Sequence, residues 1–204
     1  MIKYAPALIA GAVFIYVLEY TDLITAPVND PQGFIDNQLN GSDEEMKNAN
    51  LQAGLMCIRR WESSVSPDAY KTIVGGAKFN DFADHPRIAV KQKNGLYSTA
   101  AGAYQIVAIS KTPNGYTRAN TWDRIKTKLN LPDFSPASQD LAAIELLKER
   151  GGYYPLINGD FDGFVKAAGK EWQSVPGSPL GDPRIVTYNQ YRDFFVSNGG
   201  SINV

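Results

Sequence analysis

The sequence contains one cysteine, Cys57, and one histidine, His85, among its 204 residues. A single cysteine excludes an internal disulfide framework, and one histidine with one cysteine cannot supply the ligands of a structural zinc site. A Ser-His-Asp triad would have to use His85, and no serine elbow accompanies that histidine. We therefore expect neither a metal nor a cofactor, and we interpret Cys57 as a small core residue of a helix.

An excess of charge is also missing, because 20 Lys and Arg residues balance 21 Asp and Glu residues. This balance gives no electrostatic case for a nucleic-acid partner. Aromatic residues make up 11% of the chain, and 11 of them are tyrosines. Tyrosine rings suit a carbohydrate groove, where they stack on sugar faces, but they are equally common in protein cores.

A long apolar run occurs near the N-terminus, from Ala5 to Leu18, and it is shorter than the roughly 20 residues that a spanning helix needs. We expect residues 1–25 to form a hydrophobic anchor or targeting helix that meets a membrane or a virion partner. The alternative is a helix buried in an assembly. Residues 26–41 have the Pro, Asn, Asp and Gly content of a linker, so residues 42–204 are predicted to form the main domain.

A helix is predicted over residues 42–62, because Ser42–Glu45 has the pattern of a capping box and Ser63 with the residues after it ends the helix. Glu62 shares a face of this helix with three apolar residues, Leu51, Leu55 and Ile58. Burial disfavours the ionised carboxylate and raises its pKa, which a general acid at neutral pH requires. The alternative is that Glu62 turns outward at a fraying helix end.

The second candidate segment is Ser98–Gln105, whose small residues Ala100–Gly102 allow a backbone to approach a ligand closely. It is predicted to lead into a helix over residues 103–109, and residues 70–76 have the pattern of a short hairpin. Further helices are predicted from Thr121 as a cap, over residues 136–150, from residue 161 to about residue 172, and over residues 184–196. These elements indicate an α+β fold that is mainly helical with a small β region.

Several segments, in order, resemble the lambda-phage type endolysin family of lysozyme-like lytic transglycosylases. They cover most of the chain after Ser42, and the N-terminal segment lies outside the resemblance. The matching pieces are Trp61–Ser63, residues 70–76, Phe79–Arg87, Ser98–Gln105, residues 121–123, residues 131–140, residues 149–151 and Trp172–Gly177.

The resemblance implies a goose-lysozyme-like fold and cleavage of the β-1,4 bond between N-acetylmuramic acid and N-acetylglucosamine in bacterial peptidoglycan strands. Its catalytic acid corresponds to Glu62. Its saccharide-binding segment corresponds to Gly102, Tyr104 and Gln105, and Ser98 and Thr99 at the start of the same segment are also expected to bind substrate. The implied setting is a phage protein acting in the host periplasm, either anchored through its N-terminus or associated with the virion.

The reaction type is left open between two routes. A hydrolase needs a second carboxylate about 5 to 9.5 Å from the first, and the candidates are Asp68, Asp81 and Asp84, each more typical of a structural turn. The family instead implies lytic transglycosylation, in which Glu62 acts as acid and then as base and a 1,6-anhydromuramoyl end forms. Alternatives are a hydrolytic muramidase and a non-catalytic glycan-binding or structural virion protein on the same fold.

Four other matching residues are interpreted as structural. His85 is expected to bond to backbone within a turn, and Trp122 and Trp172 are expected to anchor the core. Arg87, which belongs to the same turn as His85, is expected to pair with an acid.

Overall fold

The computed structural model describes residues 48–117, 119–181 and 186–203. The predicted N-terminal helix over residues 1–25, the linker over residues 26–41 and the capping box Ser42–Glu45 therefore lie outside the described residues. The elements given below belong to the unit Ser42–Val204. Within the described ranges, no helix combines the length and the apolar content that a membrane span needs.

The helix that carries Glu62 is α3 (Ala49–Glu62). Asn48 caps it, because the Asn48 side chain accepts hydrogen bonds from the backbone N–H groups of Asn50 and Leu51. The face predicted to be apolar is buried, and Cys57 lies in the core with it. The cap and the buried face together fix the position of α3, and therefore the position of Glu62 at its C-terminal end.

Helix α5 (Pro136–Arg150) has the bounds that the sequence predicts. The Ser135 side chain caps its start, and Gly151, at φ 80°, ends it in the left-handed conformation. Helix α4 (Thr121–Leu129) packs against α5. Thr121 was predicted as the α4 cap, which is wrong, because Thr121 is the first helical residue and Asn120 occupies the cap position.

Three shorter helices, α6 (Tyr153–Ile157), α7 (Phe161–Ala168) and α8 (Tyr188–Ser197), form the other helical group. The sequence did not predict α6, and α7 ends at Ala168, with Gly169 as its C-cap, rather than near Trp172. Helix α8 begins later than the predicted residue 184, because Thr187 forms a capping box with Gln190. Aromatic rings of α7 and α8 pack on one another, including Phe161 on Phe195.

The β region consists of two antiparallel hairpins. Strands β1 (Val90–Lys91) and β2 (Tyr97–Ser98) pair in the first, with Val90 opposite Ser98, and β3 (Lys111–Thr112) and β4 (Gly115–Tyr116) pair in the second, with Lys111 opposite Tyr116. Where a short hairpin or small sheet was predicted from residue 70 onward, the 3-10 helix η1 (Pro67–Lys71) comes first, and an isolated antiparallel bridge between Thr72 and Lys78 then closes a turn. The β pairing of this segment is therefore limited to isolated bridges.

The helix predicted over residues 103–109 does not form. Ala101 and Ile106 exchange backbone hydrogen bonds across the segment, and Gly102 and Gln105 both have positive φ values, 77° and 49°. A run of helical dihedrals cannot pass through two left-handed residues. The segment is a tight loop, and Ile73 and Thr72 of the preceding turn bond to it.

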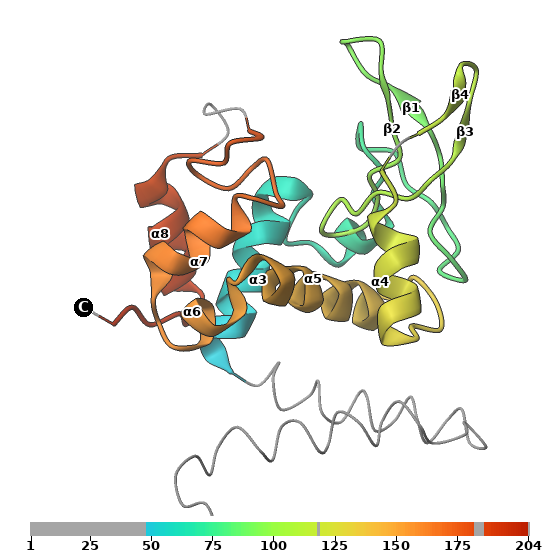
Figure 1. Ribbon diagram of the computed structural model, residues 1–204. Helices are drawn as coiled ribbons and strands as arrows, with labels where there is room; N and C mark the ends of the chain where they lie inside the picture. Colours follow the sequence, from blue (N-terminus) through green and yellow to red (C-terminus); the bar gives the residue numbers. More distant parts are fainter. Residues whose placement is uncertain (1–47, 118, 182–185, 204) are drawn as a thin grey trace, which may run out of the picture. The chain divides into compact units, whose positions relative to one another are not determined.

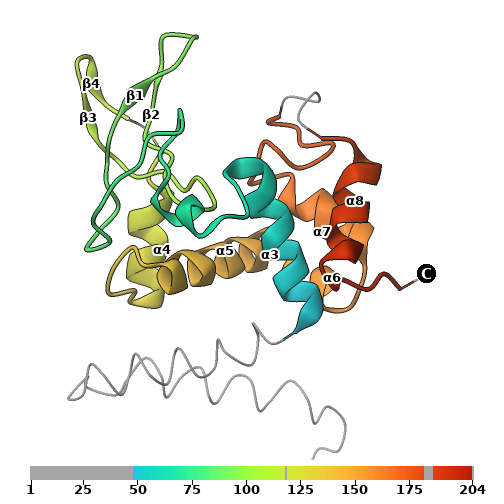
Figure 2. The same cartoon turned by 180° about the vertical axis from the view of Figure 1, so that it is seen from behind.

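Within this unit, the two hairpins and the α6–α8 group lie at opposite ends of α5, with α3 between them (Figures 1 and 2). Helix α3 contacts α5, α6 and α8. The largest buried side chains come from both ends, including Trp122 and Phe134 near the β region and Tyr191 and Phe195 in α8. One continuous core therefore supports the end of α3 from both sides.

Candidate active site

Glu62 is the last residue of α3, and its carboxylate is held by one serine. Its Oε1 accepts a hydrogen bond of 2.7 Å from Ser174 Oγ and one of 3.2 Å from the Ser174 backbone N–H. Burial raises the pKa of Glu62 above its ordinary value, and the two hydrogen bonds from Ser174 oppose that rise. The inward orientation of Glu62, one of the two alternatives that the sequence left open, is the one that the structure has, and burial shifts its carboxyl group towards the protonated form.

Aromatic rings pack around Trp61, the residue before Glu62. The Trp61 ring lies 5.1 Å from the rings of both Tyr191 and Phe194 of α8. Tyr191 is fully buried, and its hydroxyl has no hydrogen-bond partner among the described residues. Burial raises the pKa of Tyr191, and the charges of Cys57 and Glu62 contribute to the rise, so Tyr191 lies near the Glu62 carboxyl group.

The sequence did not single out Ser174 as a functional residue. It lies in Trp172–Gly177, one of the segments that resemble the endolysin family, and that membership was the available signal. Trp172 is buried, as predicted, and its Nε1 donates a 3.1 Å hydrogen bond to the Tyr104 carbonyl. The segment from Trp172 to Ser174 thus joins the Glu62 carboxylate to the small-residue loop.

The loop around Gly102 requires glycine for two reasons. Its φ of 77° is disfavoured for other residues, and a Cβ at this position would overlap with Oε1 of Gln139. That buried oxygen accepts a hydrogen bond from the Ala103 backbone N–H, and Gln139 Nε2 donates to the carbonyls of Tyr70 and Phe134. Gly102 therefore allows the Gln139 side chain to pin the loop to its neighbours.

Tyr104 does not lie where a sugar would touch it. Its side chain is 1% exposed, and its hydroxyl donates a 2.6 Å hydrogen bond to Asp140. The Tyr70 hydroxyl donates to the same carboxylate at 2.8 Å and accepts a hydrogen bond from Arg59 of α3. The expectation that Tyr104 contacts substrate is corrected to a supporting position, and the sequence could not reveal this because the partner carboxylate is distant along the chain.

The other predicted substrate-binding residues have different exposures. Gln105 is half-buried, and its Nε2 donates to the carbonyls of Thr72 and Gly102. Thr99 is buried and donates a 2.6 Å hydrogen bond to the Ala108 carbonyl, so its hydroxyl shapes the loop. Ser98 is half-buried and lines a pocket between the two hairpins.

Asp84 belongs to a polar cluster that also contains Trp122, Lys126 and Arg87. Although burial acts in the opposite sense, hydrogen bonds from these three residues hold the pKa of Asp84 well below its usual range. Arg87 also forms an ion pair with Asp123, which confirms the prediction that Arg87 pairs with an acid. Asp84 is therefore occupied as a structural anion.

His85 adjoins this cluster and is buried with backbone partners on both nitrogens. Its Nε2 lies 2.9 Å from the Ile106 carbonyl, and its Nδ1 accepts a hydrogen bond from the Arg87 N–H. Burial lowers the pKa of His85 to about 4, so the ring is neutral at neutral pH. The predicted structural role of His85 is confirmed.

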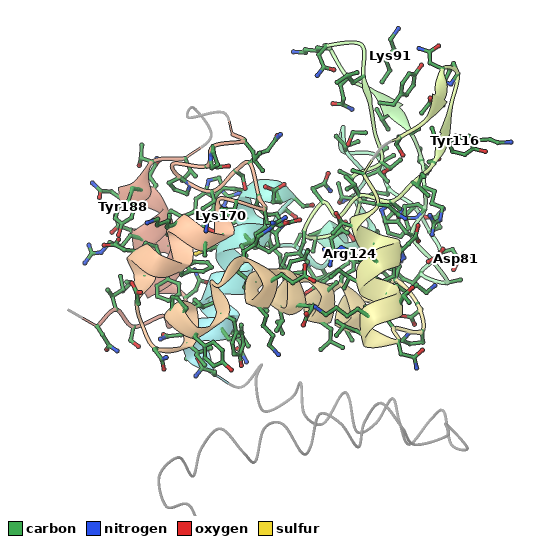
Figure 3. All side chains as sticks on the ribbon, viewed as in Figure 1. Asp81, Lys91, Tyr116, Arg124, Lys170 and Tyr188 are labelled. Carbon is green, nitrogen blue, oxygen red and sulfur yellow. The ribbon has the colours of Figure 1, made fainter. Side chains whose placement is uncertain are left out.

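The other two carboxylates considered for a second catalytic group lie on the surface. Asp81 is exposed at the periphery of the β region (Figure 3) and accepts a hydrogen bond from the Ala83 N–H. Asp68 is exposed in the first turn of η1. Among the described residues, no cluster of three or more His, Cys, Asp or Glu side chains is arranged to hold a metal ion.

The helical domain with its small β region and the buried acid at the end of α3 define a lysozyme-like protein. Two solved structures support this class: the lysozyme from bacteriophage lambda at 29% identity and a TM-score of 0.64, and bacteriophage lambda lysozyme complexed with a chitohexasaccharide at 30% identity and a TM-score of 0.66. Each likeness covers 76% of this chain and 97% of the other chain.

The Endolysin family model matches residues 58–202. The chain belongs to the Endolysin family. It is 38% identical over 112 residues to the endolysin of Escherichia phage lambda and 33% identical over 108 residues to that of Escherichia phage P2, matches that cover 55% and 50% of this chain. The matches span 64% and 59% of those relatives, so the chain covers about three fifths of their length.

Proposed function

We propose that this chain degrades peptidoglycan by cleaving the β-1,4 bond between N-acetylmuramic acid and N-acetylglucosamine, with Glu62 as the catalytic acid. The observation that carries the proposal is the carboxyl group of Glu62, which is buried at the end of α3 and held by Ser174. Burial raises its pKa, and a raised pKa favours the protonated form that a general acid needs to expel a poor alkoxide leaving group.

The reaction proposed is lytic transglycosylation. Glu62 donates its proton to the glycosidic oxygen, and the bond between that oxygen and the muramoyl C1 breaks. The acetamido group of the same sugar supports the positive charge that develops at C1. The Glu62 carboxylate then accepts the proton of the muramoyl 6-hydroxyl as that oxygen bonds to C1, which gives a 1,6-anhydromuramoyl end and restores the acid without water.

The surroundings of the other carboxylates support a mechanism with one acid. Asp84 is engaged by Trp122, Lys126 and Arg87, and Asp81 caps a turn. A hydrolytic muramidase is the second candidate, because water can take the place of the 6-hydroxyl at the same site and Glu62 can activate it. Gln105 and Ser98 are proposed to contact the sugar, and Gly102, Thr99 and Tyr104 to hold the loop that presents them.

The proposed setting is the periplasm of a bacterial host of a phage, which family membership supports. Residues 1–25 would serve as an anchor to the membrane or to a virion partner, because their sequence contains the apolar run from Ala5 to Leu18. Neither a cofactor nor nucleic acid takes part in the proposed chemistry.

The test is mass spectrometry of the muropeptides released from purified peptidoglycan by the full chain, by Glu62→Gln and by Asp81→Asn. We expect anhydromuramoyl products from the unmodified chain and Asp81→Asn, and none from Glu62→Gln. Reducing-end products lost in Glu62→Gln would establish the hydrolytic reaction instead. Release by none of the proteins would overturn the enzyme proposal and favour a glycan-binding or structural role.

A further inference from the structure

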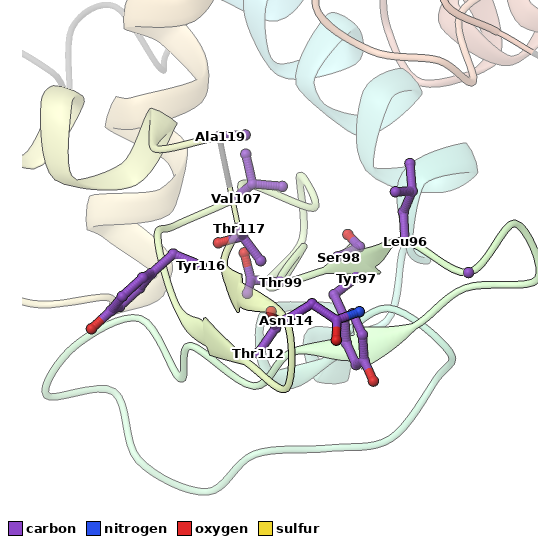
Figure 4. A pocket seen from close by; sticks show the side chains of 11 residues that line it. Leu96, Tyr97, Ser98, Thr99, Val107, Thr112, Asn114, Tyr116, Thr117 and Ala119 are labelled. Atoms are coloured by element: carbon purple, nitrogen blue, oxygen red, sulfur yellow. The ribbon is translucent and has the colours of Figure 1, made fainter.

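A pocket opens between the two hairpins of the β region. Its volume is about 370 Å³, and β2, the β3–β4 hairpin and the loops that flank them supply its lining (Figure 4). Tyr116 and Leu96 lie at opposite ends of it, and Tyr97 and Asn114 lie along one side. None of the residues of β3 and β4 entered the site described above.

The lining combines exposed apolar surface with uncharged polar groups. Leu96 is 67% exposed and Tyr116 is 62% exposed, which leaves large apolar areas facing the solvent beside the pocket. Ser98, Thr112 and Asn114 add hydroxyl and amide groups, and no lining residue carries a carboxylate, an ammonium or a guanidinium group. Aromatic rings can stack on the C–H faces of a sugar, and neutral polar side chains can hydrogen-bond to its hydroxyl and amide groups. This lining therefore matches an N-acetylated sugar.

The surroundings of the pocket are cationic. The sequence has no Asp or Glu between Asp84 and Asp123. Lys91, Lys93 and Lys111 are exposed on the hairpins, and none forms an ion pair with a described residue. Lys91 projects from the hairpin surface in Figure 3. Free cationic groups around a neutral pocket favour a glycan that bears carboxylates, and the stem peptides of peptidoglycan carry them.

The pocket is continuous along the chain with the proposed cleavage site. Tyr97 and Ser98 line it, and the same segment continues through Thr99 into the loop at Gly102. Thr99 fixes this segment to the backbone of Ala108, because its hydroxyl donates a hydrogen bond to the Ala108 carbonyl and accepts one from the Ala108 N–H.

We propose that the pocket between the hairpins is a second sugar-binding position that holds an N-acetylated sugar of the peptidoglycan strand away from the scissile bond. This inference rests on the proposed function and extends it to Tyr116 and Asn114 of the β3–β4 hairpin. The exposed lysines bind the stem-peptide carboxylates of the same strand. The position therefore selects long, peptide-bearing strands over short neutral ones.

The test is an NMR titration of the full chain with chitohexaose, followed through the backbone amides. We expect the amides of residues 112–117 to shift, and Tyr116→Ala to weaken binding about tenfold. The matched control is Tyr154→Ala, which removes a tyrosine of 63% exposure from α6 and is expected to bind as the unmodified chain does. Unmoved hairpin amides, or equal affinity of Tyr116→Ala, would overturn the proposal.

A second measurement separates this proposal from the proposed function. Digestion of peptidoglycan by the unmodified chain reports on catalysis, whereas the titration reports on the pocket. Replacing Lys91, Lys93 and Lys111 together by glutamine is expected to raise KM for peptidoglycan about tenfold and to leave chitohexaose affinity unchanged. An unchanged KM would overturn the role of the lysines. If the unmodified chain releases nothing while the hairpin amides still shift, the cleavage proposal fails and the binding position stands.

Discussion

Ser174 donates both of its hydrogen bonds to the same carboxylate oxygen of Glu62, from Oγ at 2.7 Å and from the backbone N–H at 3.2 Å. The other oxygen, Oε2, makes no hydrogen bond with a described residue. One oxygen is therefore fixed as an acceptor, and the second is left to carry the proton. This asymmetry orients the acid without consuming the atom that must reach the substrate.

Ser174→Ala is expected to raise the pKa of Glu62 further, because the serine hydrogen bonds favour the ionised carboxylate. A general acid acts in its protonated form, so the alkaline limb of the kcat/KM profile should move to higher pH. Loss of orientation should lower kcat about tenfold. The measurement is the pH dependence of muropeptide release. The control is Ser178→Ala, which removes a hydrogen bond to the Gly169 carbonyl and should leave the limb in place.

Glu62→Gln is expected to be more stable than the unmodified chain at neutral pH, by about 1 kcal/mol. Burial raises the folded pKa of Glu62 above its unfolded value near 4.5. The ionised residue therefore favours the unfolded state, and the contribution of Glu62 to folding stability declines as pH rises through its folded pKa. The advantage of the variant should shrink as pH falls through the raised folded pKa of Glu62, and it should be gone once the pH reaches the unfolded value near 4.5. Urea unfolding at several pH values measures it.

The control for this prediction is Glu149→Gln. Hydrogen bonding to Arg124 lowers the pKa of Glu149, so neutralising it should reduce stability at neutral pH. Equal responses of the two variants would mean that Glu62 is not destabilised by its burial.

His85 should make folding stability depend on pH between about 4 and 6.5. Burial lowers its folded pKa to about 4 from 6.5, so the unfolded chain binds more protons in this range and stability falls as pH decreases. The full loss should reach about 3 kcal/mol. His85 is the only histidine, so one imidazole NMR signal reports its pKa directly. A titration midpoint near 6.5 would contradict the prediction.

Gly102→Ala is expected to destabilise the domain by about 3 kcal/mol, because the new methyl group overlaps with Gln139 and also occupies a left-handed position. Gly95→Ala is the matched control. Gly95 has a φ of 82° with no atom within 4 Å of the added Cβ, so only the backbone effect of about 1 kcal/mol should remain. Thermal unfolding of both variants measures the difference, and equal losses would exclude the overlap with Gln139.

The sequence predicts helices well where local chemistry marks both ends. Helix α5 begins after a serine cap and a proline and ends at a left-handed glycine, and these signals are local. The loop after Gly102 was predicted as a helix because its residues are small and apolar, whereas its conformation is set by bonds from Thr72 and Gln139. Those partners lie in other elements, so no local pattern reveals them.

The site divides in the same way. Glu62 could be predicted because its helix places it on the apolar face with Leu55 and Ile58. Ser174 could not, because a serine in a turn carries no signal of which carboxylate it will meet. Tyr104 was assigned to the sugar from the family resemblance, and the acceptor that its hydroxyl actually meets, Asp140 in α5, is recognisable only in three dimensions.

Residues from the late part of the chain contact Glu62 and its helix α3. Ser174 is 112 residues beyond Glu62. Tyr191, whose carbonyl accepts a hydrogen bond from the Cys57 thiol, is 134 residues beyond Cys57. Contacts over such separations form slowly, because loop closure must precede them. During synthesis, α3 leaves the ribosome long before α8 exists to cover it. The carboxyl group therefore stays solvated until the last helix docks, and the acid of the proposed reaction reaches its buried surroundings only at the end of folding.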